Sequence, residues 1–241
     1  PPPPPFFYPP TPAYAILSGL VGSEMCIRDR IATEVTQYKA KYQFDSEEIS
    51  ISGIREFKKN NDGYELKFRA SNIVASMFFI SEFDIDEVGV RSNSYQIKIR
   101  PKFLKRDQLI EFDRQENIIK SSGRNTWKSS FISDEIAVDP LNAQIMIRKF
   151  IKENVNQFSL NLINMQEGGI ETYNYSVSNN IKCDFNNEKY NCVVLDRIQP
   201  GSTRKTTYYL AEELDYMFLK IIDESEERTN KLELIEILSF G

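Results

Sequence analysis

Histidine is absent from the 241-residue sequence, and cysteine and tryptophan are scarce, with three residues and one residue respectively. Histidine is the side chain most used for proton transfer near neutral pH and the commonest ligand of transition metals. Its absence excludes hydrolases that depend on a histidine base and zinc sites of the mixed cysteine and histidine type. We therefore predict no catalytic residue, no metal-binding residue and no cofactor.

Long apolar runs are also missing. The longest apolar run after residue 30 extends from Ile73 to Ile80 and is interrupted by Ser76. It is well short of the roughly 20 residues that cross a bilayer. The formal net charge is -5, which disfavours general binding of polyphosphates. We predict no transmembrane segment and no nucleic-acid partner.

Residues 1–30 do not read as native protein. Glu24 to Arg30 matches the translated end of a transposase tag used to prepare sequencing libraries, Ser18 to Ser23 extends the same junction, and Pro1 to Pro10 is a low-complexity run. We expect the native start, with any signal peptide, to be missing. No linker divides the remainder, so we predict an artefactual, disordered segment 1–30 and a single β-rich domain, 31–241.

Period-two alternation dominates that domain. Tyr38, Ala40, Tyr42 and Phe44 alternate with polar residues, which predicts a half-buried strand. Similar patterns and turn signals predict many further strands, which surround Tyr64 to Phe68, Tyr95 to Ile99, Trp127 to Ile132, Phe158 to Met165, Ile170 to Val177, Ile181 to Phe185, Tyr190 to Ile198, Arg204 to Leu210, Phe218 to Asp223 and Leu232 to Leu238, with turns at Asn61-Asp62-Gly63 and Pro200-Gly201.

The best helix signal is Asp139-Pro140, an acidic N-cap followed by a proline at the first helical position. Apolar residues then recur three and four positions apart from Ala143 to Val155, while Arg148, Lys149, Lys152 and Glu153 fall mainly elsewhere. The sequence therefore predicts a mainly β (α+β) fold, a large curved antiparallel sheet or half-barrel with one principal amphipathic helix packed on it.

Cys183 and Cys192 are candidates for a disulfide. A two-residue loop at Asn187-Glu188 would place them directly opposite each other at a non-hydrogen-bonded position, where Cα atoms lie about 4.5 Å apart, near the lower limit of disulfide geometry. A four-residue loop would change the pairing class, and two reduced cysteines in a cytosolic strand are the alternative. A disulfide would indicate an oxidising compartment such as a periplasm.

Two groups of side chains are candidates for ligand contact. Lys98, Arg100 and Lys102 share one strand face, which suits either an anionic head group or ordinary solvation. Aromatic residues on several strands suit either core packing or the lining of an apolar ligand site. The candidate lining residues are Tyr42, Phe44, Tyr64, Phe68, Tyr95 and Tyr209.

Four segments resemble a bacterial family of exported proteins, domain of unknown function 3108. They are Tyr38-Lys39-Ala40-Lys41-Tyr42, Asp139-Pro140-Leu141-Asn142-Ala143, Arg204-Lys205-Thr206-Thr207-Tyr208-Tyr209-Leu210-Ala211 and Leu214-Asp215-Tyr216-Met217-Phe218-Leu219-Lys220-Ile221. Tyr209 stands where that family usually has tryptophan, and Phe218 replaces its proline. The resemblance implies an exported, β-rich envelope protein akin to a half-barrel with a helical lid, and it carries over no catalytic residue.

The leading hypothesis is a non-enzymatic periplasmic protein of a Gram-negative bacterium that binds an apolar or amphiphilic ligand, such as a lipid or a lipoprotein, inside the curved sheet. An envelope scaffold without a ligand cavity, with another envelope protein as partner, is the alternative. A hydrolase that uses carboxylates alone would need two carboxyl groups roughly 5 to 10 Å apart in one cleft.

Overall fold

The computed structural model describes residues 34–73, 75–101, 106–132, 136–198 and 203–241, all within the unit Ile31–Gly241. The segment 1–30, Lys102 and the Pro200-Gly201 turn lie outside the described residues. The strands are β1 (Tyr38–Asp45), β2 (Ser50–Asn60), β3 (Gly63–Ser71), β4 (Ala75–Ile85), β5 (Val90–Pro101), β6 (Arg106–Asp113), β7 (Ile118–Gly123), β8 (Trp127–Ser130), β9 (Ala137–Val138), β10 (Gln157–Ile163), β11 (Ile170–Phe185), β12 (Glu188–Ile198), β13 (Lys205–Ala211), β14 (Met217–Glu224) and β15 (Thr229–Phe240). The helices are α1 (Ala143–Lys152) and the short 3-10 helix η1 (Glu212–Leu214).

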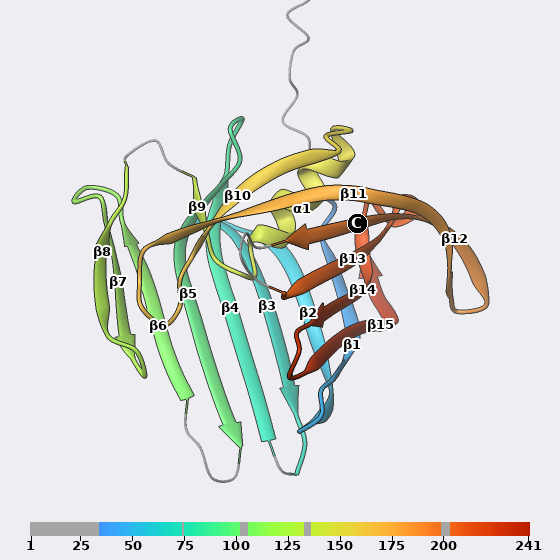
Figure 1. Ribbon diagram of the computed structural model, residues 1–241, viewed down its shortest axis with the longest axis horizontal. Helices are drawn as coiled ribbons and strands as arrows, with labels where there is room; N and C mark the ends of the chain where they lie inside the picture. The colour runs from blue at the N-terminus through green and yellow to red at the C-terminus, as the bar shows by residue number, and fades with distance from the viewer. Residues whose placement is uncertain (1–33, 74, 102–105, 133–135, 199–202) are drawn as a thin grey trace, which may run out of the picture. The chain divides into compact units, whose positions relative to one another are not determined.

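The described strands form one 15-stranded sheet in the order β8-β7-β6-β5-β4-β3-β2-β1-β15-β14-β13-β12-β11-β10-β9. Nearly all neighbours are consecutive in the chain and antiparallel, as the many turn signals predict. The long-range pairing of β1 with β15 joins the first and last strands, and β9 pairs with β10 in parallel, so the sheet is mixed at that edge. The prediction of a β-rich half-barrel with one principal helix is confirmed (Figure 1).

Helix α1 lies across the inner side of the sheet and contacts widely separated strands. The Val90 N–H of β5 donates to the Met146 sulfur at 3.1 Å, and Lys149 Nζ donates to the Glu87 carbonyl before β5 at 3.3 Å. On the opposite side, Arg148 Nε donates to the carbonyl of Asp215, just before β14, at 3.1 Å. The helix therefore holds the two arms of the curved sheet together.

The helix begins later than the sequence predicts. Its N-cap is Asn142, and Ala143 is the first helical residue. Asp139 instead caps the preceding turn, because its Oδ1 accepts hydrogen bonds from the N–H groups of Leu141 and Asn142 at 2.8 and 2.9 Å. Asp139 therefore accepts backbone hydrogen bonds as an N-cap residue does, but it does so three residues before the actual N-cap of the helix.

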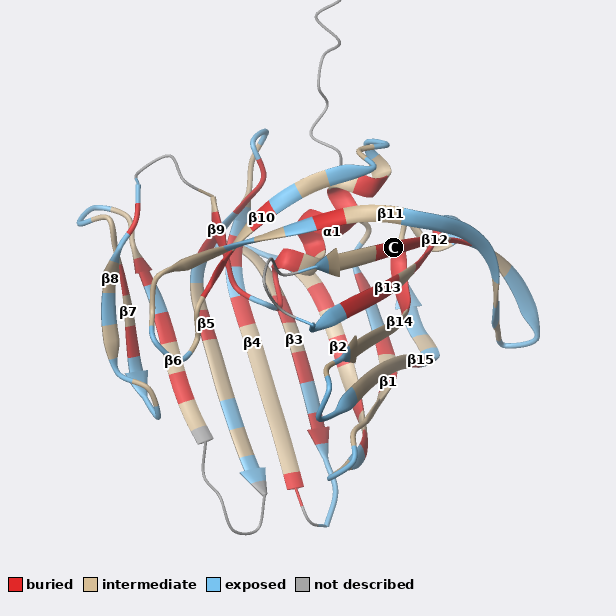
Figure 2. Cartoon of the chain, in the orientation of Figure 1, coloured by how far each residue is buried: buried red, intermediate tan, exposed pale blue. Residues whose placement is uncertain are grey.

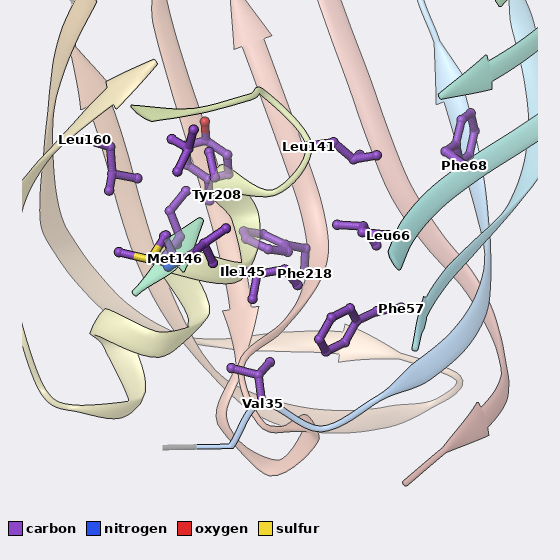
Figure 3. Close-up of a cluster of buried hydrophobic side chains, with 14 of the residues drawn as sticks. Val35, Phe57, Leu66, Phe68, Leu141, Ile145, Met146, Leu160, Tyr208 and Phe218 are labelled. Atoms are coloured by element: carbon purple, nitrogen blue, oxygen red, sulfur yellow. Dashed lines mark hydrogen bonds between the residues drawn. The ribbon is translucent and has the colours of Figure 1, made fainter. Parts of the chain in front are cut away.

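One hydrophobic cluster joins the helix to the inner face of the sheet. Figure 3 shows Ile145 and Met146 of α1 among Phe218, Leu66 and Phe57 of three different strands, all of them buried. The inward positions follow the predicted alternation, since Tyr38, Ala40 and Tyr42 of β1 are buried and Lys39 between them is exposed. Along β4, in contrast, most side chains are only half-buried (Figure 2).

Candidate functional site

A row of residues running across five strands defines the inner face of the sheet, the face on which α1 packs. Arg55 of β2 donates from Nη2 to Gln144 Oε1 of the helix at 2.5 Å, which places Arg55 on this face. The registers align Arg55 with Ala40, Phe68, Phe79 and Ile97 on successive strands, and directly opposed residues share a face. Exposure is 0% at Ala40, 1% at Arg55 and 7% at Phe68, whereas Phe79 and Ile97 are half-buried. The row therefore runs from a closed region beneath the helix to a partly open apolar surface.

A second row lies beside the first and widens this surface. It aligns Tyr42, Gly53, Ala70, Met77 and Ile99. Gly53 leaves room for the neighbouring aromatic ring, because a Cβ atom there would lie 2.6 Å from Phe68 Cζ. Met77 and Ile99 are half-buried, like Phe79 and Ile97 beside them. We call Met77, Phe79, Ile97 and Ile99 the open apolar surface.

The structure brings five of the six predicted lining aromatics to the hydrophobic cluster. Tyr42, Phe68 and Tyr95 are buried members of it, with 0%, 7% and 5% exposure, and burial raises the pKa of the Tyr42 and Tyr95 hydroxyls well above the usual range. Phe44 and Tyr64 pack against the cluster and are half-buried. The first three therefore serve as core, and Phe68 also contacts the open apolar surface, since its ring centroid lies 6.3 Å from that of Phe79.

Tyr209, the sixth, lies on the outer face. Its neighbour Tyr208 contacts Phe218 inside the cluster, with ring centroids 5.7 Å apart, and alternate residues of a strand point to opposite faces. The ammonium of Lys220 lies 5.4 Å from the Tyr209 ring centroid. The structure does not bring this residue together with the other five.

The predicted basic strand face is solvated and already partnered. Lys98 and Arg100 are exposed, the Lys98 ammonium lies 5.9 Å from the Phe78 ring centroid, and Arg100 Nη2 donates to Asp107 Oδ2 at 2.7 Å. Lys102, the third member, lies outside the described residues. Since Phe78 and Phe79 are adjacent on β4, this basic group is on the face opposite the open apolar surface.

Two arginines occupy the closed region beneath the helix. The Arg55 guanidinium lies 5.7 Å from the Tyr42 ring centroid and 5.9 Å from that of Phe218, distances typical of cation–π contact. Arg148, which the sequence pattern assigned to the polar side of the helix, is only 1% exposed, and Lys149 is 6% exposed. That assignment is wrong because Arg148 turns inward to the backbone of Asp215 and Thr36. Burial lowers the pKa of the Arg148 guanidinium.

A buried polar cluster anchors the start of the helix to β4 and β5. The Ser81 hydroxyl donates to Asp139 Oδ2 at 2.6 Å, and Asn142 Nδ2 donates to the Ser92 hydroxyl at 2.8 Å. Ser92 in turn donates to the Ala137 carbonyl of β9 at 2.9 Å. Burial raises the pKa of Asp139 to about 7. The Asp-Pro-Leu-Asn segment is therefore a structural joint between helix and sheet.

The predicted pair Cys183 and Cys192 is at disulfide distance, with Cα atoms 5.9 Å apart. The predicted register is wrong, because the two-residue loop is Asn186-Asn187, with φ angles of 50° and 64°. Cys183 consequently faces Tyr190 and Cys192 faces Ile181, and the disulfide joins the strands diagonally. Strand β11 is also continuous from Ile170 to Phe185, where the sequence predicted two strands, and it absorbs the polar segment through a bulge between Val177 and Asn179.

Two surface depressions lie elsewhere on the described residues. One of about 410 Å³ is lined by Phe158, Tyr175 and Ile198 together with polar residues of β10 and β11. The other, of about 270 Å³, includes Ile181 and Cys192 of the disulfide hairpin. Neither includes Arg55, Arg148 or a residue of the open apolar surface. The inner face is the stronger candidate site because its half-buried apolar side chains lie in the same row as a buried arginine.

Arg55 and Arg148 were missed by reasoning from the sequence. A partial signal for Arg55 was present, because Ile51, Gly53, Arg55 and Phe57 share one strand face while Ser52, Ile54 and Glu56 form the other, which places an arginine between apolar residues. Arg148 had no comparable signal, since its helical neighbours Lys149 and Lys152 are also basic.

The fold and this site define a β half-barrel with an internal helix and a partly open apolar inner face. No known family profile matches the sequence, and no curated protein matches it. Among solved structures, the chain is similar to a β-barrel-like protein of domain of unknown function DUF1849 from Brucella abortus, with 10% identity and a TM-score of 0.57 over 86% of this chain and 99% of that one. At this identity the similarity concerns the fold. None of the described helices is long and apolar enough to span a membrane.

Proposed function

We propose that this protein binds an apolar or amphiphilic ligand on the inner face of its curved sheet. The observation that carries the proposal is the open apolar surface, where four large side chains on β4 and β5 remain half-buried while the same rows are closed beneath the helix. Ligand sites are mostly apolar concave surfaces with a few polar groups. An acyl chain fits such a surface because burial of apolar area supplies about 25 cal/mol per Å².

We further propose that the protein acts in the periplasm of a Gram-negative bacterium and that residues 31–241 fold as one domain. The Cys183–Cys192 pairing supports an oxidising compartment. The four segments that resemble domain of unknown function 3108 support export, and the similarity to a β-barrel-like protein of another such domain supports a β-rich fold of this kind.

A neutral fluorescent probe, N-phenyl-1-naphthylamine, tests the binding proposal. The two adjacent phenylalanines of β4 provide a matched pair, because Phe79 lies on the inner face and Phe78 on the outer face beside Arg69, 5.1 Å from its guanidinium. We expect the wild-type chain to enhance probe fluorescence, Phe79→Ala to weaken binding about tenfold, and Phe78→Ala to leave it within about twofold. Equal effects of both substitutions, or no fluorescence change with the wild-type chain, would contradict the proposal.

An envelope scaffold is the second candidate function. It is favoured by the burial of Tyr42, Phe68 and Tyr95, which fill the closed region of the inner face with the protein's own side chains. A scaffold would show no saturable probe binding, and it would recover an envelope protein rather than an amphiphile after cross-linking in the periplasm.

A further inference from the structure

Arg55 is a buried cation without a carboxylate partner among the described residues. Its exposure is 1%, its Nη2 donates to the neutral amide of Gln144, and its Nε has no hydrogen-bond partner. Buried charges in proteins are normally paired, because an uncompensated one costs several kcal/mol. The aromatic rings of Tyr42 and Phe218 offset only a part of this cost.

Two further donors without partners lie in the same region. Arg148 is also 1% exposed, and its Nη1 has no hydrogen-bond partner. The hydroxyl of Tyr38, which is 2% exposed, has no partner either. The Arg148 guanidinium lies 5.3 Å from the Tyr38 ring centroid. Tyr38 and Tyr42, which contact one arginine each, are on the same face of β1 with only Ala40 between them. The side chains that carry the unpartnered donors are therefore Tyr38 itself and two arginines that contact Tyr38 and Tyr42 on one face of β1.

Positive charge exceeds negative charge in this region. Asp215 is the carboxylate that Arg148 contacts, with Nη2 and Oδ2 3.3 Å apart. The other oxygen of Asp215 pairs with Lys152 at 2.5 Å. One carboxylate is thus shared between a guanidinium and an ammonium, which leaves the charge of Arg55 uncompensated.

We propose that Arg55, assisted by Arg148 and the Tyr38 hydroxyl, binds the anionic head group, a carboxylate or a phosphate, of an amphiphile whose chain lies on the open apolar surface. Arginine suits this role because its planar fork of donors matches both oxyanions. The inference rests on the proposed function, since it assigns the polar end of the ligand that the inner face would hold.

The row that contains Arg55 gives the ligand its orientation. From Arg55 the row passes to Phe68, then to Phe79, then to Ile97, and exposure increases from the arginine to the two residues of the open surface. Three inter-strand spacings separate β2 from β5, about 14 Å, which suits an acyl chain of moderate length. The head group would take the place of Gln144, whose side chain is half-exposed and donates from Nε2 to the Pro140 carbonyl at 3.2 Å.

Isothermal titration calorimetry of the full chain with decanoate, decanol, decyl phosphate, acetate and inorganic phosphate tests this assignment. The variants are Arg55→Met, which removes the charge but keeps an unbranched apolar side chain, and Arg55→Lys, which keeps the charge without the planar fork. Arg69→Met is the matched control, because Arg69 of β3 is an exposed arginine on the outer face, directly opposite Ile54 of β2. Decanol binding reports whether each variant is folded.

The expected result is that decanoate or decyl phosphate binds the wild-type chain more tightly than decanol does. Arg55→Met should weaken binding of the anion by about 10- to 100-fold, the effect of a lost charge-assisted hydrogen bond, with decanol unchanged. Arg55→Lys should give an intermediate loss, and Arg69→Met no change.

Other outcomes overturn the assignment in distinguishable ways. If no ten-carbon compound binds, the proposed function itself fails. If decanol and decanoate bind alike, and Arg55→Met affects neither, the apolar site stands and the head-group assignment fails. If acetate or inorganic phosphate binds as tightly as decanoate, the anion is not part of an amphiphile and the assignment also fails.

Discussion

Replacing Arg55 with methionine should make the protein more stable in the absence of ligand. The substitution removes a guanidinium that is 1% exposed and that has one neutral hydrogen-bond partner. Methionine fills much of the same volume without a charge. The result would show that Arg55 is kept for binding, at the expense of stability.

The size of the effect follows from the contacts. The variant loses the bond to Gln144, about 1.5 kcal/mol or more, and two cation–π contacts at 5.7 and 5.9 Å, each about 0.5–1 kcal/mol. It is relieved of a desolvation cost of several kcal/mol. We expect a net gain of about 1 to 2 kcal/mol, which for a domain of this size raises Tm by roughly 2 to 8 °C.

Differential scanning calorimetry of purified chains measures this change. Arg69→Met on the outer face is the control, and its free energy of unfolding should stay within about 0.5 kcal/mol of the wild-type value. A decrease of more than about 1 kcal/mol for Arg55→Met would instead show that the folded chain fully compensates the buried charge of Arg55.

Further substitutions test other parts of the structure. Burial raises the pKa of Asp139 from 3.8 to about 7, so the free energy of unfolding should be highest below about pH 4 and should fall by up to roughly 4 kcal/mol as the pH rises to about 7. Urea unfolding at a series of pH values measures this change. Asp139→Asn should remove the pH dependence, and an unchanged profile in the variant would contradict this prediction. Tyr42→Phe leaves the buried Phe218 carbonyl without the hydroxyl that donates to it at 2.8 Å and should cost about 1–2 kcal/mol, measured by the same method; no loss would contradict that hydrogen bond. Replacing Cys183 and Cys192 together with alanine opens a loop with a sequence separation of 9 and should cost about 2–3 kcal/mol, whereas free thiols in the oxidised wild-type chain would show that the disulfide does not form.

Local patterns allowed much of the fold to be predicted. The alternation of Tyr38, Ala40 and Tyr42 identified β1 because its two faces differ clearly in polarity. The Asn61-Asp62-Gly63 segment identified the turn before β3, where Gly63 has a φ of +127°, which few other residues adopt; strand β2 on the other side of that turn was not predicted. These signals involve only neighbours in the chain, so no tertiary information was needed.

Nonlocal contacts account for what the sequence could not predict. The pairing of β1 with β15 depends on residues nearly the whole domain apart. The polar segment around Asn179 suggested the end of a strand, but pairing with β12 carries β11 through it. The inward turn of Arg148 depends on the Asp215 and Thr36 backbone, which no helical pattern encodes. The candidate site was therefore only partly predictable. The aromatic residues of the core beside it were predicted as lining residues, but its arginines and the open apolar surface were not.

Native mass spectrometry of the chain purified from a bacterial periplasm, followed by solvent extraction, shows whether the inner face holds an anionic amphiphile. We expect a bound amphiphile with a carboxylate or phosphate head group, which is released when the protein unfolds and is absent from Arg55→Met prepared in the same way. Ligand-free wild-type protein in repeated preparations, or an extracted compound that is neutral and equally abundant in the variant, would contradict it.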